Sequence, residues 1–271
     1  MAEQRGDSGI VLDACGLSDR GKVREENEDA IVCDLETGLF ILADGMGGHA
    51  SGQIASKKAI SVMANYLLKE RHVKKFQWPL DPSTKLTELG NHASVALRIA
   101  NIRVYNEAQK NEDLLGMGTT GLIFIAQNEQ VIVAHVGDSR CYLHDGQTLV
   151  RVTNDHSLVN QLMRVFNLSE AEAAEKAGKN VLVQSIGIDD DIVPEVCQVK
   201  LQRQSTVLLC SDGLTDMLSE ADIQTILEKP DINLKAKTQL LIDSANRAGG
   251  RDNISVILIT ARAQNHSLKN N

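Results

Sequence analysis

The chain is organised around the stretch Leu39-Phe40-Ile41-Leu42-Ala43-Asp44-Gly45-Met46-Gly47-Gly48-His49, an apolar run that ends in a carboxylate, a glycine-rich turn and a histidine. The apolar run predicts a buried strand that delivers Asp44 to a tight loop. Since glycine lets a backbone carbonyl approach a ligand closely, the pair Asp44-Gly45 can offer both a carboxylate and a main-chain oxygen to a hard cation. A glycine-rich turn after a strand often only reverses the chain, so the functional interpretation depends on residues elsewhere.

Length and composition indicate one ordinary globular domain. The 271 residues are 42% hydrophobic and 24% charged, and no Pro/Ser/Gly linker divides them. With only 3% aromatic residues, aliphatic side chains must fill the core. We therefore predict a flexible N-terminus over 1–9, one domain over 10–262 and a flexible tail over 263–271.

Charge and hydropathy exclude several classes of protein. The net charge of −8, without a basic stripe, argues against nucleic-acid binding. The N-terminus lacks the apolar segment of a signal peptide, and no apolar run reaches the length of about 18 residues that a membrane span needs, so we expect a cytoplasmic protein. The five cysteines are odd in number and never spaced as C-x-x-C, which predicts buried, reduced thiols.

Periodicity divides the chain into strand-like and helix-like groups. Apolar spacing predicts amphipathic helices over 53–68 and about 86–109, and the stretch 121–149 predicts an antiparallel meander. Further strands are expected over 10–17, 207–213 and 253–259, and short helical pieces form an insertion over 156–180. Because strands are grouped with strands and helices with helices, we expect an α+β layered sandwich with its sheets inside.

Acidic residues recur where predicted strands end. Asp44 and Asp212 each follow an apolar strand and precede glycine, Asp138 follows a strand and a glycine, and Asp252 directly precedes a strand. Any one of them alone is typical of a turn. Together they can converge at one edge of the sheets, where clustered carboxylates would repel one another unless cations hold them. All-oxygen ligation selects Mg²⁺ or Mn²⁺ over zinc.

Such a site needs few further parts to hydrolyse a phosphate ester. Arg24 can hold phosphate oxygens with its guanidinium fork, and His49, which titrates near neutrality, can protonate the departing alkoxide. The other interpretation, a surface arginine and a structural histidine, stays open on charge pattern alone.

Seven motifs, in order, resemble those of the bacterial form of the PP2C-type (PPM) metal-dependent protein phosphatases. The resemblance runs from about residue 12 to 261, and its motifs are Arg24-x-x-Asn27-Glu28-Asp29, Asp44-Gly45-Met46-Gly47-Gly48-His49, Gly116-Met117-Gly118-Thr119-Thr120, His135-Val136-Gly137-Asp138-Ser139-Arg140, Asn154-Asp155-His156-Ser157, Ser211-Asp212-Gly213-Leu214 and Arg251-Asp252-Asn253.

The resemblance implies a four-layer α-β-β-α sandwich with two central, mainly antiparallel sheets. It also implies that a metal-bridging hydroxide hydrolyses phosphoserine and phosphothreonine in proteins, in opposition to a Ser/Thr kinase in signalling. By the same resemblance the cofactors are two Mn²⁺ or Mg²⁺ ions and a third, weaker one. We further expect a monomer, and charge and hydropathy argue against nucleic-acid and membrane partners.

The resemblance assigns a role to each matching position. Asp44 bridges two metals, the Gly45 carbonyl binds the first, and Asp212 and Asp252 bind the second. Glu28 and Asp29 act mainly through metal-bound waters, and Asp138 holds the third ion. Arg24 binds phosphate, and His49 is the general acid.

The chain departs from the family pattern in the insertion. Phe166-Asn167-Leu168-Ser169 and Lys176-Ala177-Gly178-Lys179-Asn180 stand where bacterial relatives usually have a Gly-rich turn and a His-Pro-x-Arg-Asn stretch. The region resembles a flap beside the cleft, over about 156–192, so the departures bear on substrate choice and on affinity for the third metal.

Two alternative functions compete with catalysis. A phosphoprotein-binding module would be expected to lose a carboxylate ligand, and none is missing. A nucleotide-binding site at the glycine loop would need the Lys-Ser/Thr pair of a P-loop, and the sequence there lacks it.

Overall fold

The structure is a computed structural model that describes residues 10–47, 51–73, 75–128, 130–178 and 181–263. Its strands are β1 (Ile10–Asp19), β2 (Ala30–Asp34), β3 (Leu39–Ala43), β4 (Gly45–Met46), β5 (Gly118–Thr119), β6 (Gly121–Gln127), β7 (Gln130–Val136), β8 (Arg140–His144), β9 (Leu149–Arg151), β10 (Glu195–Gln198), β11 (Thr206–Cys210) and β12 (Ile254–Ala263). Its helices are α1 (Ser51–Leu68), α2 (Glu88–Ala108), α3 (Leu158–Phe166), α4 (Glu170–Ala177), α5 (Asp212–Thr215), α6 (Glu220–Leu227) and α7 (Leu234–Arg247), with 3₁₀ turns η1 (Glu70–His72) and η2 (Glu112–Leu114).

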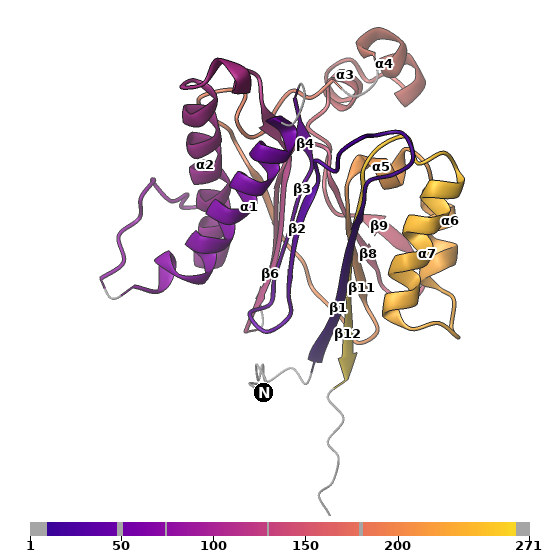
Figure 1. The fold of residues 1–271 in the computed structure, drawn as a ribbon. Coiled ribbons are helices and arrows are strands. Elements are labelled where there is room, and N and C mark those ends of the chain that lie inside the picture. Colours follow the sequence, from indigo (N-terminus) through magenta and orange to yellow (C-terminus); the bar gives the residue numbers. More distant parts are fainter. Residues whose placement is uncertain (1–9, 48–50, 74, 129, 179–180, 264–271) are drawn as a thin grey trace, which may run out of the picture.

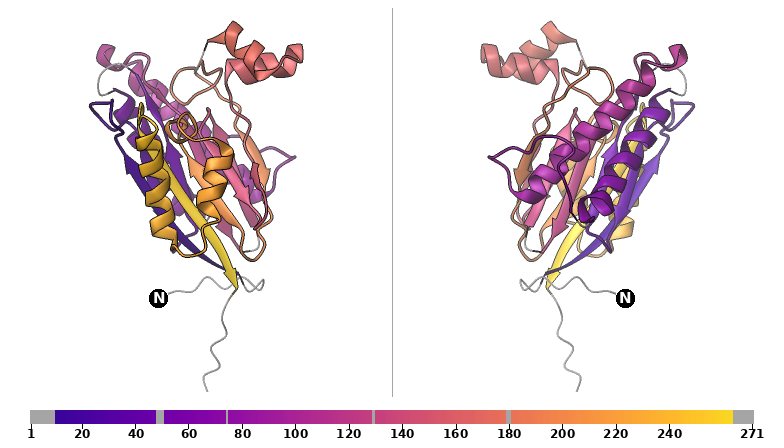
Figure 2. Two further views of the ribbon diagram at one scale, coloured as in Figure 1. Left: turned by 90° about the vertical axis from the view of Figure 1, so that its right-hand side faces the viewer. Right: turned by 90° about the vertical axis from the view of Figure 1, so that its left-hand side faces the viewer.

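Two five-stranded antiparallel sheets pack face to face in the centre of the molecule. The β12 sheet has the strand order β1-β12-β11-β8-β9, and the β6 sheet has the order β10-β7-β6-β3-β2. Helices α1 and α2 cover the outer face of the β6 sheet, and α6 and α7 cover that of the β12 sheet (Figures 1 and 2). The predicted four-layer α-β-β-α sandwich is confirmed.

Strand β3 shows why the sheets are inside. All five of its residues are buried, because its two faces meet different layers. Leu39, Ile41 and Ala43 pack against helices α1 and α2. Phe40 and Leu42 point to the other face and pack between the sheets, against β11 and β12. A strand covered on both faces reads as a continuous apolar run, which is the pattern at 39–43.

The helices begin and end close to the predicted positions. Helix α1 begins at Ser51, two residues before the expected start, and α2 begins at Glu88 after the N-cap Thr87, whose hydroxyl accepts from the Gly90 N–H at 3.1 Å. Helix α6 was not predicted, since eight residues carry too few apolar repeats to stand out. Its start is marked by a capping box between Ser219 and Asp222.

The predicted meander over 121–149 is wrong beyond β7. Strands β6 and β7 pair as expected, but β8 pairs with β11 and β9 in the opposite sheet. The chain crosses between the sheets at Gly137, whose φ is +102° and where a Cβ would lie 2.6 Å from Thr120 Cγ2. This crossing directs Asp138 to the end of the sandwich.

The insertion between β9 and β10 carries α3 and α4, which pack against each other above the ends of the sheets (Figure 1). Short helical pieces were expected here. Ser157 caps α3, and Ser169 begins α4 with a capping box to Glu172.

The cysteines are all free, but they are not all buried. Cys141 and Cys210 are buried, Cys15 and Cys197 are half-buried, and Cys33 is exposed. The prediction of buried thiols is therefore wrong for Cys33, because β2 is an edge strand whose outer side is open. Within the described ranges, none of the helices is long and apolar enough to cross a bilayer.

Candidate functional site: an acidic cleft

A cleft opens where the two sheets end, and the residues on its wall come from both sheets. Its lining residues are Arg24, Glu28, Asp44, Gly45, Met46, Gly47, Thr120, Asp138, Leu182, Asp212 and Asp252. Every predicted metal-site residue except Asp29 is in this set, and Arg24 is there too. Predicted residues from five segments of the chain therefore meet in one place, while their roles remain predictions.

The backbone around Asp44 is fixed by two threonines. The Asp44 N–H donates to Thr120 Oγ1 at 2.9 Å, and the Asp44 carbonyl accepts from the Thr120 N–H and from Thr119 Oγ1, both at 2.8 Å. Strand β4 pairs with β5 beside them. The motif at 116–120 thus aligns the turn that follows β3.

Gly45 lies where no side chain fits. A Cβ there would be 2.6 Å from the Glu28 carbonyl oxygen and would also collide with the Gly52 carbonyl oxygen. The first turn of α1 and the β1–β2 loop therefore close directly onto the Asp44-Gly45 backbone.

Asn253 anchors the loop that carries Glu28. Its side chain accepts from the Glu28 N–H at 2.8 Å and donates to the carbonyl oxygens of Arg20 and Glu26, both at 2.9 Å. The motif Arg251-Asp252-Asn253 therefore does two things, since Asp252 lines the cleft and Asn253 holds the opposite loop.

Asp29 lies buried behind the wall of the cleft. Ser211 Oγ donates to its Oδ2 at 2.9 Å, and Ser211 also accepts from the Ser255 N–H at 2.9 Å. Asp29 is thus held at the base of the site rather than on its surface.

The carboxylates raise one another's pKa values. Burial raises the pKa of Asp44 well above its ordinary value, and the charges of Asp29, Asp212 and Asp138 raise it further. Burial is also the main reason why the pKa of Asp212 rises to about 8, and those of Asp29 and Asp138 to about 6. Protons and cations both offset the mutual repulsion of these carboxylates.

The donor set fits divalent cations. Glu28 Oε1 and Asp29 Oδ1 are buried and have no hydrogen-bond partner within the described part of the chain. Buried polar atoms are normally satisfied, so these oxygens are available to a ligand or to its water shell. The five carboxylates of the cleft wall, Asp29 behind it and the Gly45 carbonyl are hard oxygen donors, which suits Mg²⁺ or Mn²⁺.

Arg24 lies at the rim of the cleft, bonded to one of its acids. Its Nη2 donates to Asp252 Oδ2 at 2.7 Å, while half of its side chain is exposed. Because of that hydrogen bond, the pKa of Arg24 is raised, so its charge is secure. His49 lies outside the described residues.

Three residues important to the cleft had no predicted role. Thr120 and Asn253 stood inside the quoted motifs, where a short polar side chain beside a glycine or an aspartate was the available signal. Leu182 comes from the insertion, and nothing in its sequence surroundings marks it.

Comparison with known proteins gives a consistent result. A sequence model of the protein phosphatase 2C family matches residues 20–243. Protein phosphatase PhpP of Streptococcus pneumoniae is 37% identical over 247 residues, which cover 90% of this chain and 95% of that protein.

Solved structures agree with the sequence comparison. The serine/threonine phosphatase PstP/Ppp of Mycobacterium tuberculosis has a TM-score of 0.79 and 30% identity, with 93% of this chain and 99% of that one covered. A structure of the PstP catalytic domain in complex with two manganese ions has a TM-score of 0.76, with the same identity and coverage. The chain belongs to the protein phosphatase 2C family.

Proposed function

We propose that this chain is a metal-dependent phosphatase that hydrolyses phosphoserine and phosphothreonine in proteins with Mn²⁺ or Mg²⁺. The observation that carries the proposal is the convergence of half-buried carboxylates from the ends of both sheets on one cleft, where Asp44 and Asp212 have raised pKa values and two acid oxygens have no partner among the described residues. The relatives' names, serine/threonine phosphatase and protein phosphatase, support the substrate class.

The proposed ligands follow the family motifs. Asp44 is proposed to bridge two ions, with the Gly45 carbonyl on the first and Asp212 and Asp252 on the second. Glu28 and Asp29 are proposed to act through water, and Asp138 to hold a third ion. When bound, the ions activate water for attack on phosphorus and offset the charge of the phosphate.

Arg24 is the chain's own phosphate-binding group in this proposal. Its half-exposed guanidinium already lies 2.7 Å from Asp252, at the mouth of the cleft. A fork of parallel N–H donors matches two phosphate oxygens, so Arg24 orients the ester for in-line attack. If Asp252 held a cation, its charge would be shared with that ion, and Arg24 would have donors available for phosphate.

We also propose a cytoplasmic monomer that opposes a Ser/Thr kinase, built as one unit over 10–262 with the insertion at about 156–192. Gel filtration with light scattering tests the monomer, because the measured mass would then be that of one 29.5 kDa chain. A stable dimer would contradict it.

The proposed function is tested by phosphate release from a phosphothreonine peptide. We expect turnover with Mn²⁺ or Mg²⁺ and none with a chelator. Arg24→Ala should lower kcat/KM by about 10–100-fold, because one charged hydrogen-bonding partner of the phosphate is lost.

The matched control is Arg262→Ala. Arg262 is also exposed and also pairs with an aspartate, Asp13, at 2.9 Å, but it lies on β12 outside the cleft. Its loss should leave kcat/KM within twofold. Turnover that persists fully in chelator, or a folded protein without turnover under any metal, would contradict the proposal.

We propose His49 as the acid that protonates the leaving oxygen, on the motif alone. His49→Ala should lower kcat steeply for phosphopeptides and little for aryl phosphates, whose leaving groups need no proton. Equal losses on both substrates would indicate a structural histidine instead.

A further inference from the structure

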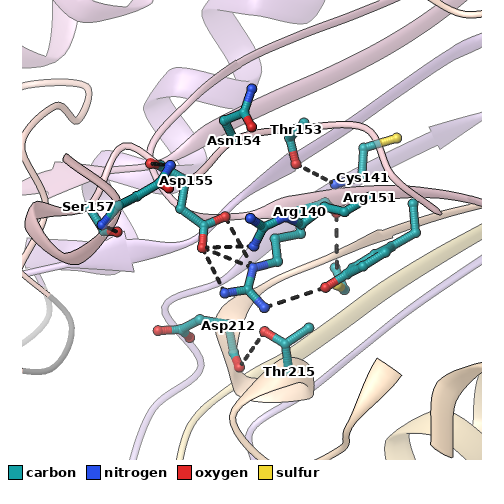
Figure 3. Close-up of polar contacts among 12 residues, drawn as sticks. Arg140, Cys141, Arg151, Thr153, Asn154, Asp155, Ser157, Asp212 and Thr215 are labelled. Atoms are coloured by element: carbon teal, nitrogen blue, oxygen red, sulfur yellow. Dashed lines mark hydrogen bonds and ion pairs between the residues drawn. The ribbon is translucent and has the colours of Figure 1, made fainter. Parts of the chain in front are cut away.

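Another acid, the mostly covered Asp155, lies beside the cleft with its charge paired by arginine. Arg140 donates to it through Nε, at 3.1 Å from both carboxylate oxygens, and through Nη2, at 2.7 Å from Oδ2. Arg151 adds a contact at 3.5 Å from the more exposed side. Figure 3 shows the Asp155 carboxylate turned toward both guanidinium groups. The Asp155 side chain is 10% exposed, and that of Arg140 is 25% exposed.

The segment around Asp155 is tied to both sheets. Thr153 Oγ1 accepts from the Cys141 N–H at 3.0 Å, in the β12 sheet. On the other side, the Asn154 carbonyl bonds to Nε2 of His135, a residue of β7 in the β6 sheet, at 2.8 Å. The ion pair with Arg140, the first residue of β8, therefore fixes a segment that spans the two layers.

The next residue, His156, holds the turn that presents Asp138. Its N–H donates to the Gly137 carbonyl at 3.0 Å, and its Nδ1 accepts from the Gly137 N–H at 3.3 Å. Both polar groups of the Gly137 backbone thus bond to one residue. The position of Asp138 depends directly on where the segment 154–156 lies.

The same segment is the root of the insertion. The Asp155 carbonyl accepts from Asn160 Nδ2 at 2.8 Å, in the first turn of α3, and Ser157 forms a β-bridge with Leu182. Leu182 belongs to the wall of the cleft. This partly buried ion pair is therefore connected to a proposed ligand, Asp138, and to Leu182 in the wall of the cleft.

The charge balance of this segment depends on Arg140 as well. If Arg140 were lost, the Asp155 carboxylate would keep only the 3.5 Å contact with Arg151, and its charge would be left largely unpaired beside the Gly137–Asp138 turn.

We propose that Arg140 and Asp155 are positioning residues that set the Asp138 turn and the Leu182 wall for cation binding. This inference rests on the proposed function, since it concerns the cation that Asp138 would hold. Partners of metal ligands commonly change metal affinity or activity by about 10–100-fold when mutated.

The test is a calorimetric titration of the full chain with Mn²⁺, together with the Mn²⁺ concentration for half-maximal hydrolysis. Arg140→Met should raise both the dissociation constant and that concentration by about tenfold or more. Arg140→Lys, which keeps the charge but not the fork, should fall between Arg140→Met and the wild type. Arg262→Met, which breaks the exposed pair with Asp13, should change neither value by more than twofold.

The outcomes separate this inference from the proposed function. A wild-type chain that binds no Mn²⁺ would contradict the proposed function itself. A wild type that binds Mn²⁺, with an Arg140→Met variant that binds within twofold of it, would overturn only the positioning role, even if the variant melts at a lower temperature. If Arg140→Met does not fold, Arg140→Lys decides, and a wild-type dissociation constant in that variant would overturn the inference.

Discussion

The molecule buries aspartates in two neighbouring places and treats their charges in opposite ways. At the cleft, Asp44 lies among Asp29, Asp212 and Asp138, and the charges that act most strongly on it are all negative. Beside the cleft, Asp155 lies under a guanidinium fork with N–O distances of 2.7–3.1 Å. The second acid is neutralised by the protein, whereas the first group depends on protons or on cations from outside.

This difference separates a structural site from one built for chemistry. An unpaired buried charge is costly, so the apo cleft lowers the stability of the fold. A cation that binds the folded state but not the unfolded chain restores stability. The gain is about 2.7 kcal/mol when the cation concentration is 100 times the dissociation constant. The Arg140–Asp155 pair is already charge-balanced without metal.

The largest expected effect comes from removing one charge of the cleft. Asp44→Asn should reduce Mn²⁺-dependent phosphate release by about 10³-fold, because a proposed bridging ligand is lost. In chelator the same variant should melt at a higher temperature than the wild type, because Asn needs neither the proton nor the cation that the Asp44 carboxylate must take up on folding.

Asp13→Asn is the matched control for this change. Asp13 is half-exposed on β1 and pairs with Arg262, so its variant should keep wild-type turnover and gain no stability. Full metal-dependent turnover in Asp44→Asn would remove Asp44 from the proposed mechanism.

Removing the paired acid should change stability in the other direction. Asp155→Asn leaves the partly buried Arg140 without its counter-ion, and we expect a loss of about 2–3 kcal/mol in the free energy of unfolding. Urea unfolding in chelator measures it. A gain in stability, like that expected for Asp44→Asn, would show that the two acids do not differ in the way described.

The pH dependence of stability provides a third comparison. The folded-state pKa of Asp212 is about 8, above its ordinary 3.8, so at pH 6.5 the folded chain holds a proton that the unfolded chain has lost. Stability in chelator should therefore fall as the pH rises from 6.5 to 8, by about 1–2 kcal/mol. Urea midpoints at constant ionic strength would show it.

The histidines act in the opposite direction, and most of their effect lies below this window. The pKa values of His92 and His156 are lowered to about 4, mainly by burial, so the unfolded chain binds protons that the folded chain does not, and stability falls as the pH drops through their ordinary 6.5. Saturating Mn²⁺ should remove the decrease between pH 6.5 and 8, since the cation replaces the proton. A stability that rises through this window in chelator would contradict the raised pKa of Asp212.

The sequence predicted the layers and the cleft residues because both follow local patterns. A buried strand such as β3 is a continuous apolar run, and Asp44 and Asp212 each stand where such a run ends. What had no local pattern was the crossing at Gly137. The turn signal was visible, but the choice between returning to β7's sheet and entering the other one depends on packing around Thr120.

The ion pair was equally invisible in the sequence. Arg140 and Asp155 are 15 residues apart and meet only because β8 and β9 form a hairpin whose following segment folds back. No period or spacing rule marks such a pair. Asp29 shows the same limit, since its motif placed it near the metal but not behind the wall, under Ser211.

The smallest expected effect concerns the hydrogen bond between Ser211 and Asp29, behind the wall of the cleft. Ser211→Ala removes the hydroxyl that donates to Asp29 and accepts from the Ser255 N–H, so it should cost about 1 kcal/mol of stability and weaken Mn²⁺ binding about threefold. Ser205→Ala is the control, because Ser205 is equally buried and accepts from the Gln202 N–H at 3.0 Å, but lies outside the cleft. If both variants lose the same stability and only Ser211→Ala loses Mn²⁺ affinity, the hydroxyl tunes the acid. Equal Mn²⁺ affinity in both would mean that Ser211 only joins two strands, and that the cleft acids are set by their mutual charge alone.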